Sequence, residues 1–304
     1  MWIKNLQLFL LNAKWNHSAT ALEEKLAEMP CRDCGPQELR TEGFVPPLKA
    51  SDRLVFAAEG LQLLCYQEIT RLLPAAVIRE LLDEKVEDIE AKENRKMGRK
   101  EKADLKEQVV FEALPRAFSR SRRTYCVIDT QTGRVMVDAS SRKLAEQVTE
   151  ALRKAVGSLP IAPPVSNVSV SSVMTEWLQA PKHWPPMVTL GDRGELRDGN
   201  DDGPVVRVTG MDLLGDEVKT HLNAGMELAK VNLCWRDLLE FDLAEDLSVK
   251  RLRPLDQLKE QMDEQDAEDP EAEMMASLAL QGGNIRQLLD VLFPVLSVEA
   301  PKPI

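Results

Sequence analysis

Cys31 and Cys34 form the one local cysteine pair in this 304-residue sequence, and two residues between the sulfurs suit half of a zinc site or a redox dithiol. A zinc site needs two more ligands, but no second pair occurs, and the other cysteines and the three histidines are scattered. A thioredoxin-like dithiol begins a helix after a strand, whereas this pair follows a predicted helix and enters a loop. We therefore expect two loop cysteines here.

Carboxylates offer a second candidate chemistry. Asp129 and Asp138 end the two strands of a predicted hairpin, from which they could face each other and hold a metal. Because Asp is a favoured turn residue, we expect them instead to end strands and cap turns. Phosphate-binding glycine loops, His-Glu-x-x-His and Gly-x-Ser-x-Gly are all missing from the sequence. The sequence thus predicts no enzyme site, no metal and no cofactor.

Basic residues are concentrated in one segment. Residues 92–123 hold eleven Lys or Arg and five acids, a net charge of +6, which leaves −17 for the rest of a chain whose total is −11. Such a stripe could lie along nucleic-acid phosphates, although a charge run is more often a solvated helix surface. The candidate DNA-binding residues are Lys92, Arg95, Lys96, Arg99, Lys100, Lys102, Arg116, Arg120, Arg122 and Arg123.

These residues must be positioned by helices and a hairpin. Apolar periodicity predicts helices on both sides of a polar elbow near Gly98, the first from Pro74 and the second ending at Pro115. A hairpin is expected over residues 125–138, followed by a helix capped by Ser140 or Ser141.

Elsewhere the chain mixes strands and helices without a regular alternation, which favours an α+β fold of mixed sheets and long helices. Residues 165–173 are predicted as a strand, 179–204 as a loop, 226–253 as two or three strands, and 274–296 as a helix pair. We expect four parts: an N-terminal α+β part (1–73), a helical arm with the basic elbow (74–123), a hairpin–helix–strand domain (124–204), and a C-terminal α+β region with an acidic segment (205–304).

Composition restricts the location and the partners. No window approaches the roughly 18 apolar residues of a membrane span, and the N-terminus lacks the basic leader and cleavage site of a secretory signal. Five cysteines without framework spacing suit a reducing cytosol. Residues 255–273 carry nine acids and one lysine, which suits the outer surface or a basic protein partner.

Short strings along nearly the whole chain resemble the recombination-associated protein RdgC family, in the family's order. They are WIKNL (2–6), GFVPP (43–47), LPRAFSRS (114–121), IDT (128–130), GRVMVD (133–138), LRK (152–154), GSLP (157–160), TEW (175–177) and VKRL (249–252). No single string is a functional signature, but the set in this order is hard to obtain by chance.

The resemblance implies a cytoplasmic, nucleoid-associated protein that binds double-stranded DNA without sequence specificity. It also implies horseshoe-shaped, multi-domain subunits that close into a homodimeric ring around the duplex and restrain RecA-dependent recombination. By position, Arg95 and Phe118 match segments that the family uses for DNA binding and ring closure. Phe118 would suit a pocket on the partner subunit, or else simple core packing. Some relatives carry lysines where this chain has residues 209–212 (TGMD), which puts a second DNA contact there in doubt.

Two other functions stay open. One is a protein-interaction factor that acts on recombination proteins, RecA among them, through the acidic segment. The other is a metal-dependent nuclease or thiol enzyme built on Asp129 and Asp138 or on the cysteine pair.

Overall fold

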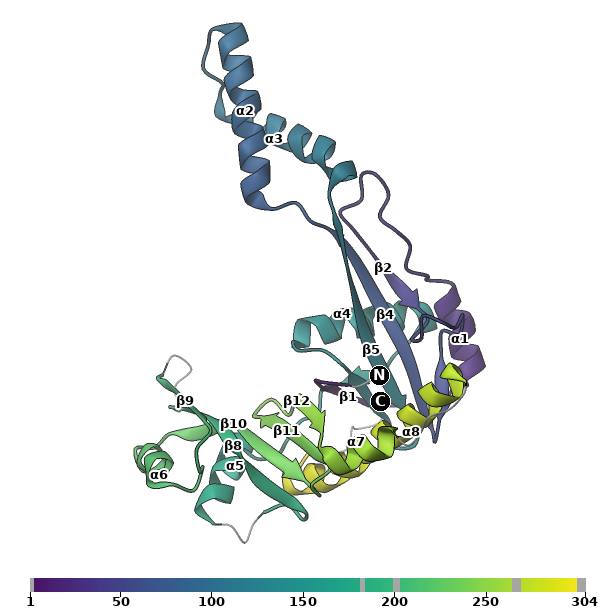
Figure 1. Cartoon of the computed structure of the whole chain (residues 1–304), viewed down its shortest axis with the longest axis vertical. Helices are drawn as coiled ribbons and strands as arrows, with labels where there is room; N and C mark the ends of the chain where they lie inside the picture. The colour runs from purple at the N-terminus through teal and green to yellow at the C-terminus, as the bar shows by residue number, and fades with distance from the viewer. Residues whose placement is uncertain (1–2, 181–183, 199–202, 264–268, 300–304) are drawn as a thin grey trace. The chain divides into compact units, whose positions relative to one another are not determined.

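The computed structural model of the chain describes residues 3–180, 184–198, 203–263 and 269–299 (Figure 1). The chain divides into two compact units. The first contains Met1–Glu28, Pro46–Cys65 and Thr124–Ile304, and the second contains Met29–Val45 and Tyr66–Arg123. The chain passes between the units after Glu28, after Val45, and within two long strands, β4 (Leu61–Arg71) and β5 (Ser119–Asp129).

One sheet has seven strands in the order β2-β4-β5-β6-β1-β7, in which β2 is Arg40–Val45, and β3 pairs with β4 beside this path. Its other strands are β1 (Gln7–Leu11), β3 (Phe56–Ala58), β6 (Arg134–Val137) and β7 (Ile161–Ala162). Helices α1 (Ala19–Ala27) and α4 (Arg142–Val156) contact each other, and Ser18 and Ser141 cap them by accepting backbone N–H groups. Gly157 ends α4 at a φ of 81°, a conformation that favours glycine.

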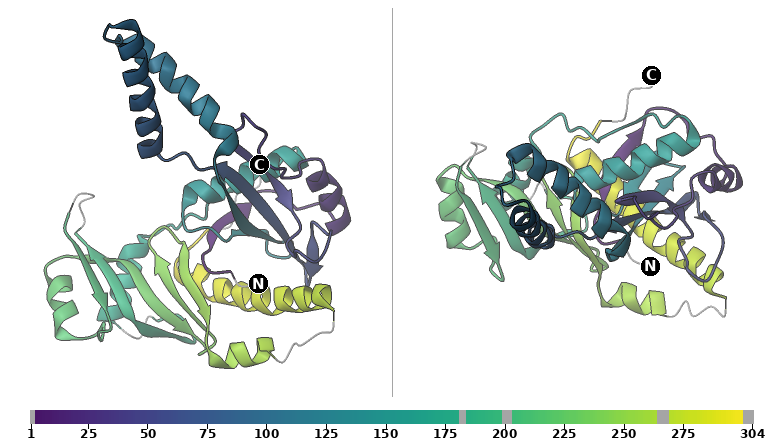
Figure 2. Two further views of the ribbon diagram at one scale, coloured as in Figure 1. Left: turned by 45° about the horizontal axis from the view of Figure 1, so that its top comes forward. Right: turned by 90° about the horizontal axis from the view of Figure 1, so that it is seen from above.

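The second sheet, which belongs to the first unit, is antiparallel, in the order β12-β11-β10-β8-β9 (green in Figure 2). Its strands are β8 (Val188–Arg197), β9 (Val205–Thr209), β10 (Glu227–Trp235), β11 (Leu239–Ala244) and β12 (Val249–Pro254). The helices of this part are α5 (Val170–Gln179), α6 (Asp216–Asn223), α7 (Asp256–Asp263) and α8 (Pro270–Val295). One apolar core, which includes Trp177, Trp235 and Phe241, joins residues of both sheets.

The second unit holds β2 (Arg40–Val45), parts of β4 and β5, and a helical hairpin of α2 (Ala75–Glu93) and α3 (Arg99–Ala113). Each helix buries only a narrow apolar stripe, Ile78 and Val86 on α2 and Leu105 and Val109 on α3. A short 3-10 turn (Leu114–Arg116) follows α3 and leads into β5.

The α+β class and most predicted elements are confirmed, including the hairpins, both helices of the arm and all three strands of 226–253. Three predictions are wrong. Residues 165–173 do not form the expected strand: 170–173 are the start of α5, because the Ser169 side chain caps a helix whose Val170, Met174 and Trp177 are buried. The expected loop at 179–204 contains β8, and residues 181–183 and 199–202 of it lie outside the described residues.

The third correction concerns the end of the chain. The predicted helix pair is the single helix α8, which continues through Gly282 and Gly283. Gly282 lies against Leu61, so a glycine is required there for close packing rather than for a turn.

Candidate nucleic-acid interface

The basic elbow between α2 and α3 is held by ion pairs within the hairpin. Arg95 bonds Glu93 (2.7 Å) and both carboxylate oxygens of Glu101 (2.8 and 2.9 Å), and Lys96 bonds Glu90 (2.6 Å). The hydrogen bonds from Arg95 and from the Gly98 backbone lower the pKa of Glu101 to about 2. Arg95 and Lys96 therefore fix the turn as well as carrying charge.

Other cations of the hairpin project from it without such partners. Lys92, Arg99 and Lys100 are exposed, and the described residues provide no ion pair or side-chain hydrogen bond for them. Lys102 is also exposed and lies 3.8 Å from Glu90. Within the described residues, the ammonium and guanidinium groups of Lys92, Arg99 and Lys100 are therefore available to an anionic ligand, whereas Lys102 has an acidic partner.

The arginines predicted near the start of β5 do not form one cluster. Successive strand residues point to opposite faces, so Arg120 and Arg122 share a face and Arg123 lies on the other. Arg122 lies 3.8 Å from Glu68, and Arg116 belongs to the 3-10 turn before the strand. The four arginines therefore lie at three different places: the 3-10 turn, one face of β5 and the opposite face of β5.

Phe118 lies beside an apolar hollow of the second unit. Its side chain is 85% exposed, which excludes core packing. A hollow of about 560 Å³ is lined by Phe118 together with apolar residues of the hairpin and its flanks, such as Leu72, Val77, Leu81 and Val109. An exposed ring next to an open apolar hollow is typical of a protein contact surface.

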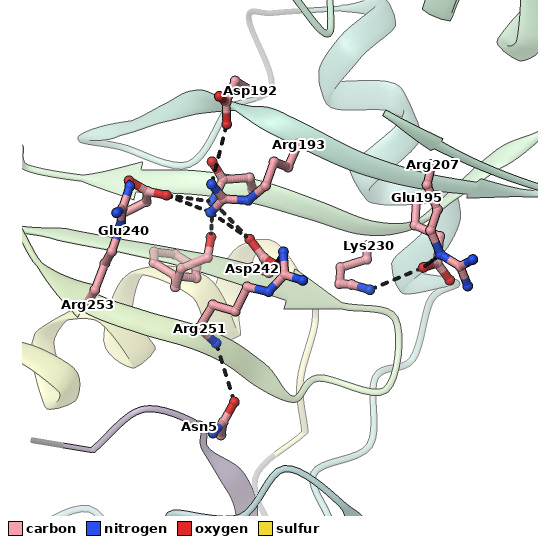
Figure 3. A network of polar contacts seen from close by, with 12 residues as sticks. Asn5, Asp192, Arg193, Glu195, Arg207, Lys230, Glu240, Asp242, Arg251 and Arg253 are labelled. Atoms are coloured by element: carbon pink, nitrogen blue, oxygen red, sulfur yellow. Dashed lines mark hydrogen bonds and ion pairs between the residues drawn. The ribbon is translucent and has the colours of Figure 1, made fainter. Parts of the chain in front are cut away.

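A charged face covers one side of the β8–β12 sheet, and the sequence analysis did not identify it. We call this the charged sheet face; its members are Arg193, Glu195, Arg207, Lys230, Glu240, Asp242, Arg251 and Arg253, which Figure 3 labels, together with Arg197 and Asn232. The other side of the same strands is apolar and buried, through residues such as Leu196, Val208 and Leu252.

Cross-strand pairing builds the first half of the charged sheet face. Glu195 stands opposite Arg207 on β9 and Lys230 on β10. Its carboxylate accepts hydrogen bonds from Arg207 Nε (3.1 Å), Lys230 Nζ (3.2 Å) and Arg197 (2.8 Å). Burial raises the pKa of Glu195, but these three cations outweigh that effect and lower it to about 2.

The second half is centred on Asp242 and Glu240. Arg193 donates to Glu240 (2.6 Å) and to Asp242 (3.3 Å), while Asn232 Nδ2 donates to Asp242 (2.9 Å). Arg251 lies 3.5 Å from Asp242, and Arg253 bonds Glu240. Asn232 also explains Gly191 in β8, because a Cβ there would overlap the asparagine side chain.

The residues considered for metal or thiol chemistry have structural contacts. Asp129 is fully buried and accepts two hydrogen bonds from Arg286 (2.7 and 3.0 Å) and one each from the Gln131 and Thr132 backbone. Asp138 accepts the backbone N–H groups of residues 4 and 5. In the part of the chain that the structure describes, no group of three His, Cys, Asp or Glu could hold a metal ion.

The cysteine pair is likewise placed in a structural setting. Cys34 is buried, with its thiol 3.4 Å from the Ile69 carbonyl oxygen, and burial raises the pKa of the half-buried Cys31 thiol. A raised thiol pKa disfavours the thiolate that thiol chemistry needs.

The sequence did contain a signal for the charged sheet face. Charged or amide residues alternate with apolar ones in Lys230-x-Asn232, Glu240-x-Asp242 and Arg251-x-Arg253, a period of two that indicates a two-faced sheet. The sequence could not show the strand register, which places these residues of five strands on one face.

The fold and the two surfaces define an α+β protein with basic side chains on a helical hairpin and on a sheet face. A family model described as "Putative exonuclease, RdgC" matches residues 1–299. Proteins named "Recombination-associated protein RdgC" are similar over almost the whole length. The one from Tolumonas auensis is 39% identical over 98% of this chain and 99% of its own. Those from Pseudomonas syringae pv. syringae and Aeromonas hydrophila subsp. hydrophila are 38% and 37% identical, over 98% of this chain and 98% and 99% of theirs.

The chain therefore belongs to the RdgC family of recombination-associated proteins, and the resemblance inferred from the short strings is confirmed. Within the described residues, no helix has the length and apolar character needed to cross a membrane.

Proposed function

We propose that this protein binds double-stranded DNA without sequence specificity and thereby restrains RecA-dependent recombination in the nucleoid. The observation that supports this most directly is the set of exposed cations on the α2–α3 hairpin, Lys92, Arg99 and Lys100, for which the described part of the chain provides no acidic partner. Contacts to phosphates release counterions and carry no base information, so the expected binding is salt-dependent and tolerant of sequence.

The test is a salt series of binding to a labelled duplex of arbitrary sequence, measured by fluorescence anisotropy. A variant with Lys92→Gln, Arg99→Gln and Lys100→Gln leaves the elbow pairs of Arg95 and Lys96 intact. Each lost phosphate contact makes the negative slope of log K against log salt shallower by about 0.9. The loss of three contacts should therefore make the slope shallower by up to about 2.7.

A matched control removes three exposed lysines of the first unit, Lys14→Gln, Lys49→Gln and Lys143→Gln, with the same change in net charge. The control should keep the wild-type slope. If the folded wild type binds no duplex at low salt, the proposal is wrong, and the acidic segment becomes the leading interaction surface.

We further propose that two copies form a ring around the duplex, with Phe118 of each copy in the apolar hollow of the other. The exposed ring and the hollow lie on one unit, which permits a self-complementary, two-fold contact. Phe118→Ser should shift the protein from dimer toward monomer in light scattering. Phe111→Ser, at a residue that is 60% exposed on α3 outside the hollow, is the control and should leave the dimer unchanged.

The proposed action is not enzymatic. DNA incubated with the protein and Mg²⁺ should stay full-length, while strand exchange by RecA should slow in proportion to the DNA bound. Release of nucleotides that persists after chromatography to constant specific activity would contradict this and favour the exonuclease description. Inhibition of RecA that survives in the triple hairpin variant, despite its lost DNA binding, would indicate direct protein contact.

A further inference from the structure

We infer that the charged sheet face is a second phosphate-binding site for duplex DNA, formed by Arg207, Arg251 and Arg253. This inference rests on the proposed function, since it assumes that duplex DNA is the ligand. It assigns binding to residues of β9 and β12 that lie far in sequence from the basic segment of residues 92–123.

The carboxylates of this face lie beneath its arginines. Glu195 and Asp242 are only 8% and 4% exposed, whereas the side chains of Arg207 and Arg251 are 74% and 68% exposed. A ligand that approaches the sheet therefore meets guanidinium groups first. Such a surface attracts anions, and the charged sheet face as a whole has six cations against three acids.

The arginines keep unused donors. A guanidinium has five N–H groups, and Arg207 engages Glu195 through Nε alone. Arg251 and Arg253 each approach a carboxylate through one terminal nitrogen. Among the described residues, no other partner occupies the remaining guanidinium nitrogens of these three arginines, and paired N–H donors match the oxygens of a phosphate.

The buried carboxylates also position the arginines. A guanidinium held at one end by an ion pair loses less conformational freedom when it binds a ligand at the other end. The face contains a polar hollow of about 120 Å³ that is lined by Arg193, Arg207 and Arg251, with Thr209 and Lys230 also in its lining. Cations that are fixed on a sheet face suit contact with the phosphate backbone rather than the reading of base sequence.

Removal of the three arginines should weaken binding without unfolding the sheet. In a variant with Arg207→Gln, Arg251→Gln and Arg253→Gln, every buried carboxylate keeps a cation: Arg197 and Lys230 for Glu195, and Arg193 for Glu240 and Asp242. Far-UV circular dichroism and thermal unfolding confirm folding before the binding assay.

The measurement is the salt series on the duplex described above, with wild type, the sheet variant and the Lys14, Lys49 and Lys143 control. From about 50 to 200 mM salt, each phosphate contact contributes about a 3.5-fold loss of affinity. Over this salt range, the fold loss of affinity should be up to about 40 times smaller for the sheet variant than for wild type. The control should lose as much affinity as wild type.

A gain-of-charge pair keeps the inference falsifiable if the sheet variant unfolds. Val205 is 42% exposed on β9, two residues from Arg207 and on the same face, and Val168 is 43% exposed elsewhere in the unit. Val205→Lys should increase affinity and steepen the salt slope by about 0.9, whereas Val168→Lys should change neither.

The two proposals fail in different ways. Duplex binding by wild type that is unchanged in the sheet variant and in Val205→Lys overturns this inference and leaves the hairpin proposal standing. A wild type that binds no duplex at low salt overturns both.

Discussion

Replacement of Arg286 by methionine should strongly destabilise the first unit. Asp129 has no exposed side-chain surface, and Arg286 provides its only ion pair among the described residues, through Nε and a terminal nitrogen. Arg286→Met keeps the apolar stem but leaves a buried carboxylate with backbone N–H partners alone. Breaking a buried pair in this way costs about 3–5 kcal/mol in the free energy of unfolding, or about 6–20 °C in Tm for a unit of this size.

The pH dependence should change sign. Burial raises the pKa of Asp129. The hydrogen bonds from Arg286 and Thr132 and the positive charge of Arg286 outweigh burial, so this pKa lies below its ordinary value. In wild type this contribution to stability is present above the unfolded pKa of about 3.9 and is lost as the pH falls below it. Without Arg286 burial prevails, the folded pKa lies above the unfolded one, and acidification reduces the defect.

The assay is thermal unfolding of wild type and Arg286→Met at pH 7 and at pH 5, followed by circular dichroism. Asp129→Asn added to Arg286→Met removes the buried charge and should recover part of the lost stability at pH 7. Lys219→Met, which breaks an exposed pair with Asp216, is the control and should have no measurable effect. A loss below about 1 kcal/mol that does not depend on pH would refute the reasoning.

Three further changes test packing, capping and electrostatics. Gly282→Ala should cost about 1–3 kcal/mol in urea unfolding because its Cβ would overlap the buried Leu61, whereas Gly283→Ala, with open space around it, should stabilise α8 by up to about 1 kcal/mol. Ser141→Ala removes the hydrogen bond that caps α4 and should lower stability by about 1 kcal/mol in the same assay. The pKa of Glu195 is lowered to about 2, so its carboxylate stabilises the fold above the unfolded pKa of about 4.3, and this stabilisation is lost as the pH falls toward 2. In an acid titration, Glu195→Gln should therefore flatten the stability curve between these two pH values.

Elements with local signals could be predicted from the sequence. Ser18 and Ser141 mark helix starts, and Gly133 closes the β5–β6 turn at a φ of 69°. Strand β8 could not be predicted in this way. Its glycines and charges resemble a loop, and it becomes a strand because Glu195 pairs with Lys230 on β10 and Gly191 makes room for Asn232.

The candidate surfaces also differ in how far they could be predicted from the sequence. A run of charge in one helical hairpin is visible in sequence, so Lys92, Arg99 and Lys100 could be identified as exposed cations. That Arg95 is held by Glu101 depends on the folded elbow. The charged sheet face joins residues from β8 to β12, and only the register of the sheet shows which of its charges are buried.

The net charge of −11 is consistent with binding to a polyanion because electrostatic interactions in salt are local. At physiological ionic strength the screening length is about 8 Å, so an acidic surface farther away than this contributes little at a basic face. At the charged sheet face, the buried Glu195 and Asp242 hold Arg207 and Arg251 outward, while the more exposed Asp192 and Glu245 are ion-paired with Arg193 and Arg197. The decisive quantity is therefore the exposed charge within one screening length of the ligand, which the two triple variants change and the control triple variant does not.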